Sequence, residues 1–151
     1  MTQRNLILLA TAGSAGLLVG AWIFQLFGYP PCKLCLWQRW PHAAAVLIGA
    51  LALWRPVAFL PLAGAAAALM TGAVGVYHTG VERNWWEGPD TCTSGDVSGL
   101  SASELMDQIL TAPLIQCDVV AWDLFGVSMA SWNSILSFGL VMIWIAAFKR
   151  T

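Results

Sequence analysis

A run of 22 residues without a single charge, from Leu6 to Phe27, constrains this chain more than any other feature. As a helix, such a run rises about 33 Å, which is enough to cross a hydrocarbon core of about 30 Å. Only 10% of the 151 residues are charged, whereas an ordinary soluble domain has about 25%. The chain has too few polar side chains to cover a water-facing surface, so we expect an integral membrane protein.

The charge balance argues against two other classes of protein. Intrinsic disorder requires low hydrophobicity and high net charge, but this chain is 58% hydrophobic with a formal net charge of -1. Its seven Lys and Arg residues are scattered and form no basic patch, so no nucleic-acid partner is expected. We predict a single integral membrane domain over residues 1–151, with the lipid bilayer as its surroundings.

Four apolar segments predict an all-α membrane protein, built as a four-transmembrane-helix bundle. The predicted helices are 6–27, 33–54, 57–81 and 132–148, and the exported loops are 28–32 and 82–131. The second helix carries Arg39 inside its outer end, and Arg55-Pro56 closes it. A signal peptide cleaved after residues 10–12 is the alternative for the first segment, but the apolar stretch before that site has only five residues.

The positive charges predict the orientation, because Lys and Arg are enriched in cytoplasmic loops. An even number of spans places both termini on one side. That side holds Arg4, Arg55, Lys149 and Arg150, and the opposite side holds Lys33, Arg39 and Arg83. We therefore expect cytoplasmic termini and exported loops. All eight Asp and Glu residues fall within the predicted loop 82–131, which makes it an acidic exported loop.

A short amphipathic helix is predicted inside this second exported loop. Ser101-Ala102-Ser103-Glu104 matches a capping box, and Pro113 would end the helix. The apolar residues Leu105, Met106, Ile109 and Leu110 share one face. The helix would lie flat on the membrane surface or pack on the loop's own residues, and its lack of Lys and Arg leaves both placements open.

Four cysteines lie on the exported side of this topology, namely Cys32, Cys35, Cys92 and Cys117. Cysteines in an oxidising compartment pair as disulfides. Three connectivities are possible, and spacing favours Cys32 with Cys35 and Cys92 with Cys117. The second pair would either order its loop, by about 3 kcal/mol, or exchange with the first pair. A four-cysteine metal site is the rival, but this is poor spacing for zinc, so no metal is expected.

The Cys-x-x-Cys pair has the features of a redox site. Its ring is too small to constrain the unfolded chain much, so a structural role gains little. Pro30 and Pro31 suit a helix start, which places Cys35 in the first turn, where the helix dipole favours a thiolate. Arg39 follows one turn later and would stabilise that thiolate or an anion on a bound electron acceptor. The alternatives are a snorkelling Arg39 and an interfacial His42 without a further role.

These features together resemble the DsbB family, the bacterial inner-membrane quinone reductases that reoxidise DsbA. The resemblance covers essentially the whole chain. It is carried by the segment from Cys32 to Arg39 after Pro30-Pro31, the four spans, the cysteine pair in the last exported loop, and Trp122 to Gly126 with Met129 and Trp132. The vitamin K epoxide reductase family has its loop cysteines before the Cys-x-x-Cys, so the order here argues against it.

The resemblance implies a thiol:quinone oxidoreductase with a periplasmic DsbA-type partner. Cys92 and Cys117 would accept electrons from that partner, with Cys92 forming the mixed disulfide. Electrons would then pass to Cys32 and Cys35 through a transient link between Cys32 and Cys117. Cys35 would face the quinone, either ubiquinone or menaquinone.

The resemblance also implies two quinone-site residues, Arg39 beside Cys35 and His78 in Tyr77-His78-Thr79 at the outer end of the third helix. An interfacial histidine without another role is the alternative for His78. DsbA is a strong oxidant at about -120 mV, so its electron acceptor must be more oxidising than a glutathione pool at about -240 mV. The sequence has no Gly-x-Gly-x-x-Gly and no Cys-x-x-Cys-His, which leaves a lipid-soluble quinone as the acceptor that fits.

A second reading from another class is a non-enzymatic four-helix membrane scaffold whose disulfides staple its exported loops. The two readings differ in the reactivity of the cysteines. A scaffold has disulfides of very low potential that do not exchange, whereas the enzyme has disulfides that exchange and a Cys35 that responds to quinone.

Overall fold

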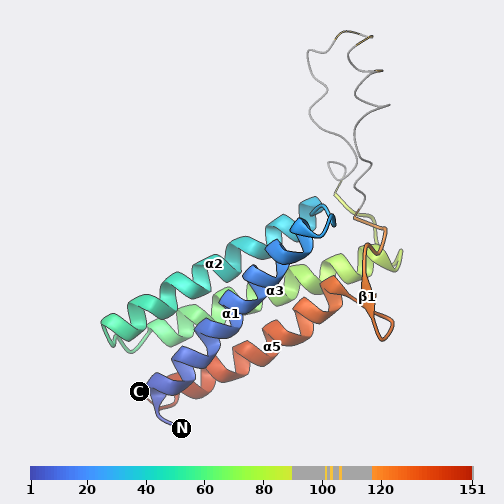
Figure 1. Ribbon diagram of the computed structural model, residues 1–151. Helices are drawn as coiled ribbons and strands as arrows, with labels where there is room; N and C mark the ends of the chain where they lie inside the picture. Colours follow the sequence, from blue (N-terminus) through green and yellow to red (C-terminus); the bar gives the residue numbers. More distant parts are fainter. Residues whose placement is uncertain (90–100, 102, 104–105, 107–116, 151) are drawn as a thin grey trace.

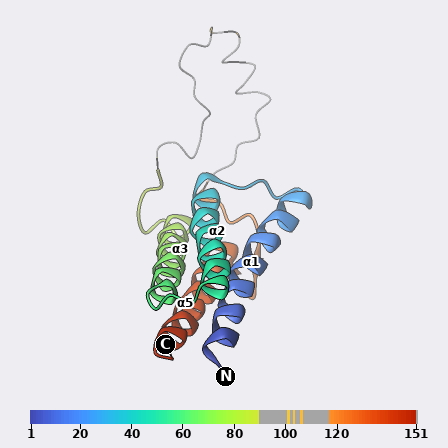
Figure 2. The same ribbon diagram turned by 90° about the vertical axis from the view of Figure 1, so that its left-hand side faces the viewer.

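The computed structural model describes residues 1–89, 101, 103, 106 and 117–150. Within these ranges, four long helices form an antiparallel bundle (Figure 1). They are α1 (Gln3–Leu26), α2 (Lys33–Trp54), α3 (Leu60–Glu82) and α5 (Met129–Phe148). Helices α1 and α3 each pack against both α2 and α5. The two termini lie at one end of the bundle, and the start of α2 and the end of α3 lie at the other (Figures 1 and 2).

Capping residues explain where two helices begin. The Thr2 side chain accepts a hydrogen bond from the Asn5 N–H, so α1 starts three residues before the predicted position 6. Ser128 accepts from the Ser131 N–H in the same way and starts α5 at Met129, ahead of the predicted position 132. The polar caps extend each helix beyond the apolar run that hydropathy detects.

Three of these helices, α1, α3 and α5, are long and apolar enough to cross a membrane. Helix α2 has 22 residues and the predicted bounds 33–54, but Gln38, Arg39 and His42 make its first half too polar to meet the same standard. The all-helical bundle is therefore observed, with three clear candidate spans where the sequence predicts four. The amphipathic helix predicted in loop 82–131 falls almost wholly outside the described residues.

A two-stranded hairpin precedes α5. Strand β1 (Asp123–Leu124) pairs antiparallel with β2 (Val127–Ser128), with Asp123 opposite Ser128. Phe125 and Gly126 have φ values of 56° and 73°, the two positive angles that a type I′ turn requires. The hairpin connects the segment around Trp122 to the first turn of α5, where the Met129 N–H donates to the Trp122 carbonyl oxygen over 3.3 Å.

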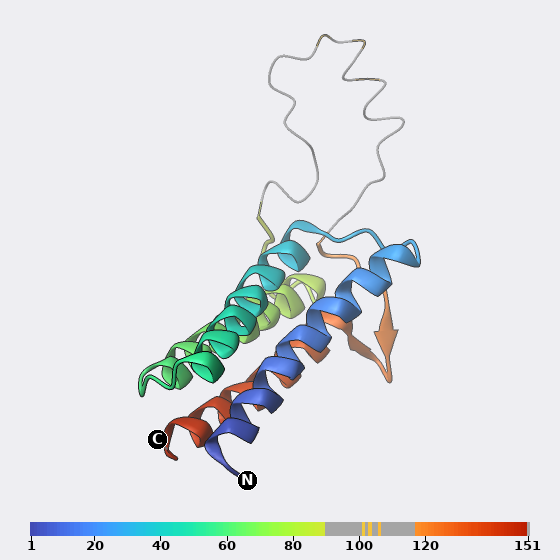
Figure 3. The same ribbon diagram turned by 60° about the vertical axis from the view of Figure 1, so that its left-hand side comes forward.

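The bundle packs differently at its two ends. Near the termini, an apolar cluster surrounds the fully buried Trp144, and Gly64 of α3 lies directly against its indole ring. Near the start of α2, the buried side chains include the polar residues Gln38, His42, Thr71 and His78. The end of α1 leans away from α2 and α3 on this side (Figures 2 and 3).

Candidate functional site

The start of α2 brings Cys32 and Cys35 together. Cys32 is the N-cap residue, with extended backbone angles, and its Sγ accepts a hydrogen bond from the Cys35 N–H over 3.2 Å. The two Sγ atoms lie 2.8 Å apart, with the Cys32 thiol donating to Cys35. Both cysteines are free, so this is a reduced dithiol whose sulfurs need to approach by under about 1 Å to reach the disulfide length of about 2.05 Å.

The proton of this dithiol is held on Cys32. The hydrogen bond to the Cys35 sulfur and the burial of the side chain both raise the pKa of the Cys32 thiol. Cys35 receives that hydrogen bond and lies in the first turn of α2, where the helix dipole stabilises negative charge. The negative charge of the reduced pair therefore belongs on Cys35, the sulfur that the sequence predicts to be the reactive one.

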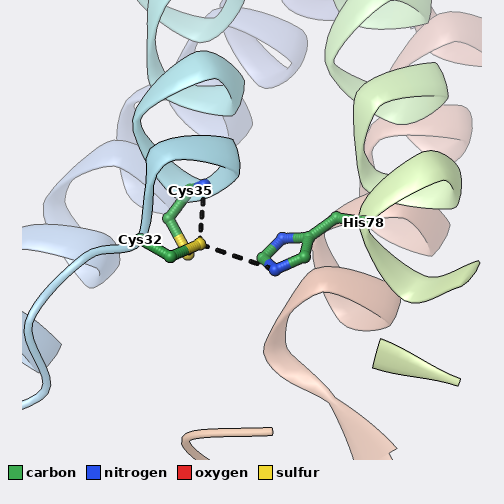
Figure 4. Close-up of side chains that lie close together, drawn as sticks. All are labelled: Cys32, Cys35 and His78. Atoms are coloured by element: carbon green, nitrogen blue, oxygen red, sulfur yellow. Dashed lines mark hydrogen bonds between the residues drawn. The ribbon is translucent and has the colours of Figure 1, made fainter. Parts of the chain in front are cut away.

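His78 projects toward the dithiol from the adjacent helix α3 (Figure 4). Its Nε2 lies 3.5 Å from Cys32 Sγ and 3.8 Å from Glu82 Oε1, and the ring also interacts with the backbone of Cys117. The sequence predicts His78 only loosely, at the outer end of the third helix. The structure places it in contact with the first cysteine of the pair.

Cys117, which follows the undescribed part of the acidic loop, lies next to this site. It is 2% exposed, it is disulfide-bonded, and it belongs to the same buried cluster as Cys32, Leu34 and Val81. Cys92 lies outside the described residues. The structure thus brings one cysteine of the predicted loop pair into the cluster that contains the Cys-x-x-Cys motif.

A cavity of about 460 Å³ opens beside Cys35, between α1, α2, α5 and the segment before the hairpin. Its lining includes all three residues that the sequence predicts around the acceptor, Cys35, Arg39 and His78. Arg39 is held on the α1 side, because its Nη1 donates to Gln25 Oε1 over 3.0 Å and its Nη2 donates to the Ala21 carbonyl oxygen over 3.3 Å. A fixed positive charge is therefore anchored in the same cavity that Cys35 lines.

Glu82 corrects one sequence expectation. The acidic loop was predicted to begin with it, but Glu82 is the last residue of α3 and its side chain is only 6% exposed. The carboxylate is retained at this depth because Ser128 donates a hydrogen bond to its Oε2 and His78 lies near its Oε1. A carboxylate directly after an apolar helical segment can indicate a buried acidic side chain. The sequence prediction does not detect it, because it assigns Glu82 to the loop.

Three polar residues of the site are missing from the sequence prediction, namely Gln38, Thr71 and Asn133. Each is buried or partly buried between the helices and hydrogen-bonded to another of them. Polar side chains inside apolar helices are commonly functional, which is the signal that would have found them. His42, for which the sequence favours no role, joins them by placing its Nε2 2.9 Å from Asn133 Oδ1.

The ligand atoms of Cys32, Cys35 and His78 lie within 4.8 Å of one another, which is close enough to share a metal ion. Tetrahedral zinc with Zn–S bonds of about 2.3 Å separates two sulfurs by about 3.8 Å. The sulfurs here are 2.8 Å apart, so a metal would require them to separate by about 1 Å. Their spacing suits sulfur–sulfur chemistry better.

These observations define a helical membrane protein with a hydrogen-bonded pair of free thiols at one end of its bundle. Residues 3–147 match the model of the family described as "Disulfide bond formation protein DsbB". The chain belongs to the DsbB family. Membership implies a role in disulfide bond formation and a disulfide oxidoreductase activity.

Curated relatives agree with this assignment. The chain is 29% identical over 153 residues to a Disulfide bond formation protein B of Verminephrobacter eiseniae, with 96% of this chain and 84% of the relative covered. It is 26% identical over 151 residues to one of Albidiferax ferrireducens, covering 94% and 84%. An uncharacterized protein of Rickettsia prowazekii is 27% identical over 121 residues, covering 78% and 70%. No solved structure matches significantly.

Proposed function

We propose that this chain is a thiol:quinone oxidoreductase that reoxidises a periplasmic DsbA-type protein and passes the electrons to a membrane quinone. The observation that carries the proposal is the position of the dithiol between two features. Cys117 of the loop pair is buried in one cluster with Cys32, and Cys35 lines an adjacent cavity with Arg39 and His78. Electrons can therefore enter the pair at Cys32, which lies in the cluster with Cys117, and leave from Cys35 to a molecule in the cavity.

The entry steps are two thiol–disulfide exchanges. A thiolate of the partner attacks Cys92 in the Cys92–Cys117 disulfide and releases Cys117 as a thiolate, and the partner's second thiol then releases Cys92. Cys117 attacks Cys32 in the Cys32–Cys35 disulfide and releases Cys35 as a thiolate, and Cys92 then attacks Cys117, which re-forms the Cys92–Cys117 disulfide and releases Cys32. The partner leaves oxidised, with one disulfide gained, and two electrons remain in the chain's own thiols. Burial of Cys117 near Cys32 supports the second exchange.

The exit step takes place at the cavity. Its volume of about 460 Å³ lies within the range of ligand pockets, about 300–1,000 Å³, and its largely apolar wall with one anchored guanidinium fits a quinone ring. When bound, a quinone supplies an acceptor for two electrons and two protons. Cys35 would yield the electrons as the Cys32–Cys35 bond forms again, and Arg39 would stabilise negative charge at a ring oxygen. The Cys32 thiol would supply one proton, and water would return the proton that Cys35 lost when it became a thiolate.

We further propose that the whole chain forms one domain with four spans in a bacterial inner membrane. Helix α2 has 22 residues and rises about 33 Å, and its polar side chains Gln38 and His42 are buried inside the bundle, away from lipid. Arg4, Arg55, Lys149 and Arg150 all fall at or near the termini end of the bundle (Figure 1). The positive-inside rule then supports cytoplasmic termini and a periplasmic dithiol.

The test is reduction of soluble ubiquinone and menaquinone analogues by the purified chain in detergent, driven by a reduced DsbA-type donor. We expect turnover in the intact chain and none in Cys35→Ser or Cys92→Ser. Ser14→Ala is the matched control, because Ser14 is buried in α1 and its hydroxyl has no hydrogen-bond partner among the described residues. A folded intact chain that reduces neither analogue would overturn the proposal and favour the stapled scaffold.

A further inference from the structure

Two buried amides lie behind His78 and connect it to His42. Gln38 Nε2 is 3.2 Å from the Leu34 carbonyl oxygen and 2.9 Å from His78 Nδ1. Gln38 Oε1 accepts from Asn133 Nδ2 over 2.7 Å. The other end of that amide, Asn133 Oδ1, lies 2.9 Å from His42 Nε2. The four side chains form one continuous hydrogen-bonded chain across α2, α3 and α5.

A single backbone group sets the orientation of the first amide. The Leu34 carbonyl oxygen can only accept, so the Gln38 atom beside it must be the NH₂ group. The second hydrogen of that NH₂ group is directed at His78 Nδ1, which must therefore be an acceptor without a proton. A neutral imidazole then carries its hydrogen on Nε2. The tautomer of His78 thus follows from one helical carbonyl.

The second amide continues the same order. Gln38 Oε1 can only accept, so Asn133 presents its NH₂ group to it and its carbonyl oxygen to His42, which must donate from Nε2. Thr71 binds the other hydrogen of the Asn133 amide. Its hydroxyl donates to the backbone carbonyl oxygen of Gln38 over 3.1 Å and accepts from Asn133 Nδ2 over 3.2 Å. Every hydrogen of both amides has an acceptor.

The groups around His78 Nε2 agree with this assignment. Cys32 Sγ lies 3.5 Å away, Glu82 Oε1 lies 3.8 Å away, and the ring contacts the backbone of Cys117. All are able to accept a hydrogen bond, as an Nε2–H group requires. Cys32 in turn donates its own thiol hydrogen to Cys35. In this series of hydrogen bonds, each side chain therefore donates to the next one in the same direction. The order is His42, Asn133, Gln38, His78, Cys32 and finally Cys35.

We propose that Gln38, oriented by Leu34 and Asn133, is a positioning residue that fixes His78 as the Nε2–H tautomer. In this tautomer His78 cannot accept the Cys32 thiol hydrogen, which is therefore donated to Cys35 and stabilises a thiolate there. With the opposite tautomer, a nitrogen lone pair would face Cys32 Sγ and compete with Cys35 for the thiol proton. Fixing the tautomer removes that competitor. The inference rests on the proposed function only in that Cys32 and Cys35 are taken as the redox pair.

The direct test is ¹⁵N NMR of histidine-labelled, reduced chain in detergent. The sequence has two histidines, and removing one at a time assigns the signals. We expect the intact chain to show His78 with its proton on Nε2. In Gln38→Met, which keeps the length of the side chain but removes the amide, both tautomers should be populated. A His78 proton on Nδ1 in the intact chain would overturn the inference, whatever the variants do.

A second readout follows Cys35 itself, by its rate of alkylation with iodoacetamide at neutral pH, located by mass spectrometry. We expect about a three- to tenfold slower rate in Gln38→Met and in Asn133→Leu, since one hydrogen bond to a charged group is redistributed. Ser134→Ala is the control. It removes a buried hydrogen bond from α5 to the Gly72 carbonyl oxygen of α3, and this bond is not part of the series of hydrogen bonds from His42 to Cys35.

Equal slowing in Ser134→Ala would show general loosening of the helices and contradict the positioning role, as would unchanged rates in both network variants. If one network variant does not fold, the other gives the same comparison. Neither measurement uses quinone or a protein partner. A chain that fails to reduce quinone but shows the predicted tautomer would therefore refute the proposed function and leave this inference standing.

Discussion

The two ends of the helix bundle differ in their buried side chains, which are apolar near the termini and largely polar near the dithiol. At the end near the termini, Trp144 is fully buried and its ring fills the space that a Cβ at Gly64 would occupy, 2.7 Å from the nearest ring atoms. At the dithiol end, the helices are joined by hydrogen bonds between Gln38, Thr71 and Asn133. The difference shows that a small membrane bundle can place close apolar packing at one end and a hydrogen-bonded polar cluster beside its two free thiols at the other.

The separation has a physical reason. Lipid gives no hydrophobic driving force between helices, so close packing of small residues carries association. Hydrogen bonds between membrane helices contribute only about 0.6 kcal/mol on average. The dithiol end can therefore use polar groups for orientation, while the termini end supplies the packing. Substitutions near the termini should consequently change the free energy of unfolding, and substitutions near the dithiol should change the rates of quinone reduction and of thiol alkylation.

The largest effect is expected at the dithiol. Cys35→Ser should abolish quinone reduction, because the Cys32–Cys35 disulfide cannot form again without Cys35, although Cys32 also lines the cavity. The free energy of unfolding, followed by tryptophan fluorescence in mixed detergent, should change by no more than about 0.5 kcal/mol. A large loss of stability together with the loss of activity would show that the two ends are not separable in this way.

The next effect concerns the two thiols of the reduced chain. Because the pKa of the Cys32 thiol is raised by its hydrogen bond to Cys35 and by burial, Cys32 stays protonated at neutral pH and only the thiolate reacts. Iodoacetamide should modify Cys35 about ten to a hundred times faster than Cys32. Mass spectrometry of the labelled peptides measures the ratio, and equal rates would refute the placement of the proton on Cys32.

At the termini end, Gly64→Ala should lower the free energy of unfolding by about 1–3 kcal/mol, because the added Cβ overlaps a ring with no room to move. The rate of quinone reduction per folded molecule should not change. Gly139→Ala in α5 is the matched control, since nothing lies within 4 Å of the added atom. Reduced turnover in folded Gly64→Ala would mean that packing near the termini also positions the site.

The smallest effect tests whether the polar end contributes to stability at all. Thr71→Val keeps the shape of the side chain but removes the hydroxyl between Gln38 and Asn133. We expect a loss of about 0.6 kcal/mol in the same unfolding assay. A loss above about 2 kcal/mol would instead make the hydrogen-bonded end a structural element equal to the apolar end.

Much of the fold is readable from the sequence because hydropathy and charge determine membrane helices. The bounds of α2 agree with the prediction, whereas α3 begins at Leu60 rather than at position 57, because Pro61 suits the first turn of a helix better than its interior. The start of α5 was missed because the cap at Ser128 is polar and lies beyond the apolar run.

The site was only partly readable. The Cys-x-x-Cys spacing and its prolines predict a redox pair with Cys35 in the first helical turn, and helical periodicity places Arg39 on the same face as Cys35. That Cys32 caps the helix and that the two thiols are free is seen only in the structure. The contact between His78 and Cys32 joins residues 46 positions apart, so it depends on how α3 packs on α2. Gln38 and Asn133, 95 positions apart, show the same limit. Local patterns predict Cys35 and Arg39, but they predict neither the buried or partly buried positions of Gln38 and Asn133 nor which residues these side chains contact.

The lean of α1 has a consequence for which molecules the cavity admits. Gly16 and Gly20 of α1 both line the cavity, and a Cβ at either position would meet nothing within 4 Å. The α1 side of the cavity is therefore bare backbone at two points. A larger side chain at position 16 or 20 would therefore narrow the cavity without touching Cys32 or Cys35, so the size of the molecule that the cavity admits can change separately from the thiols.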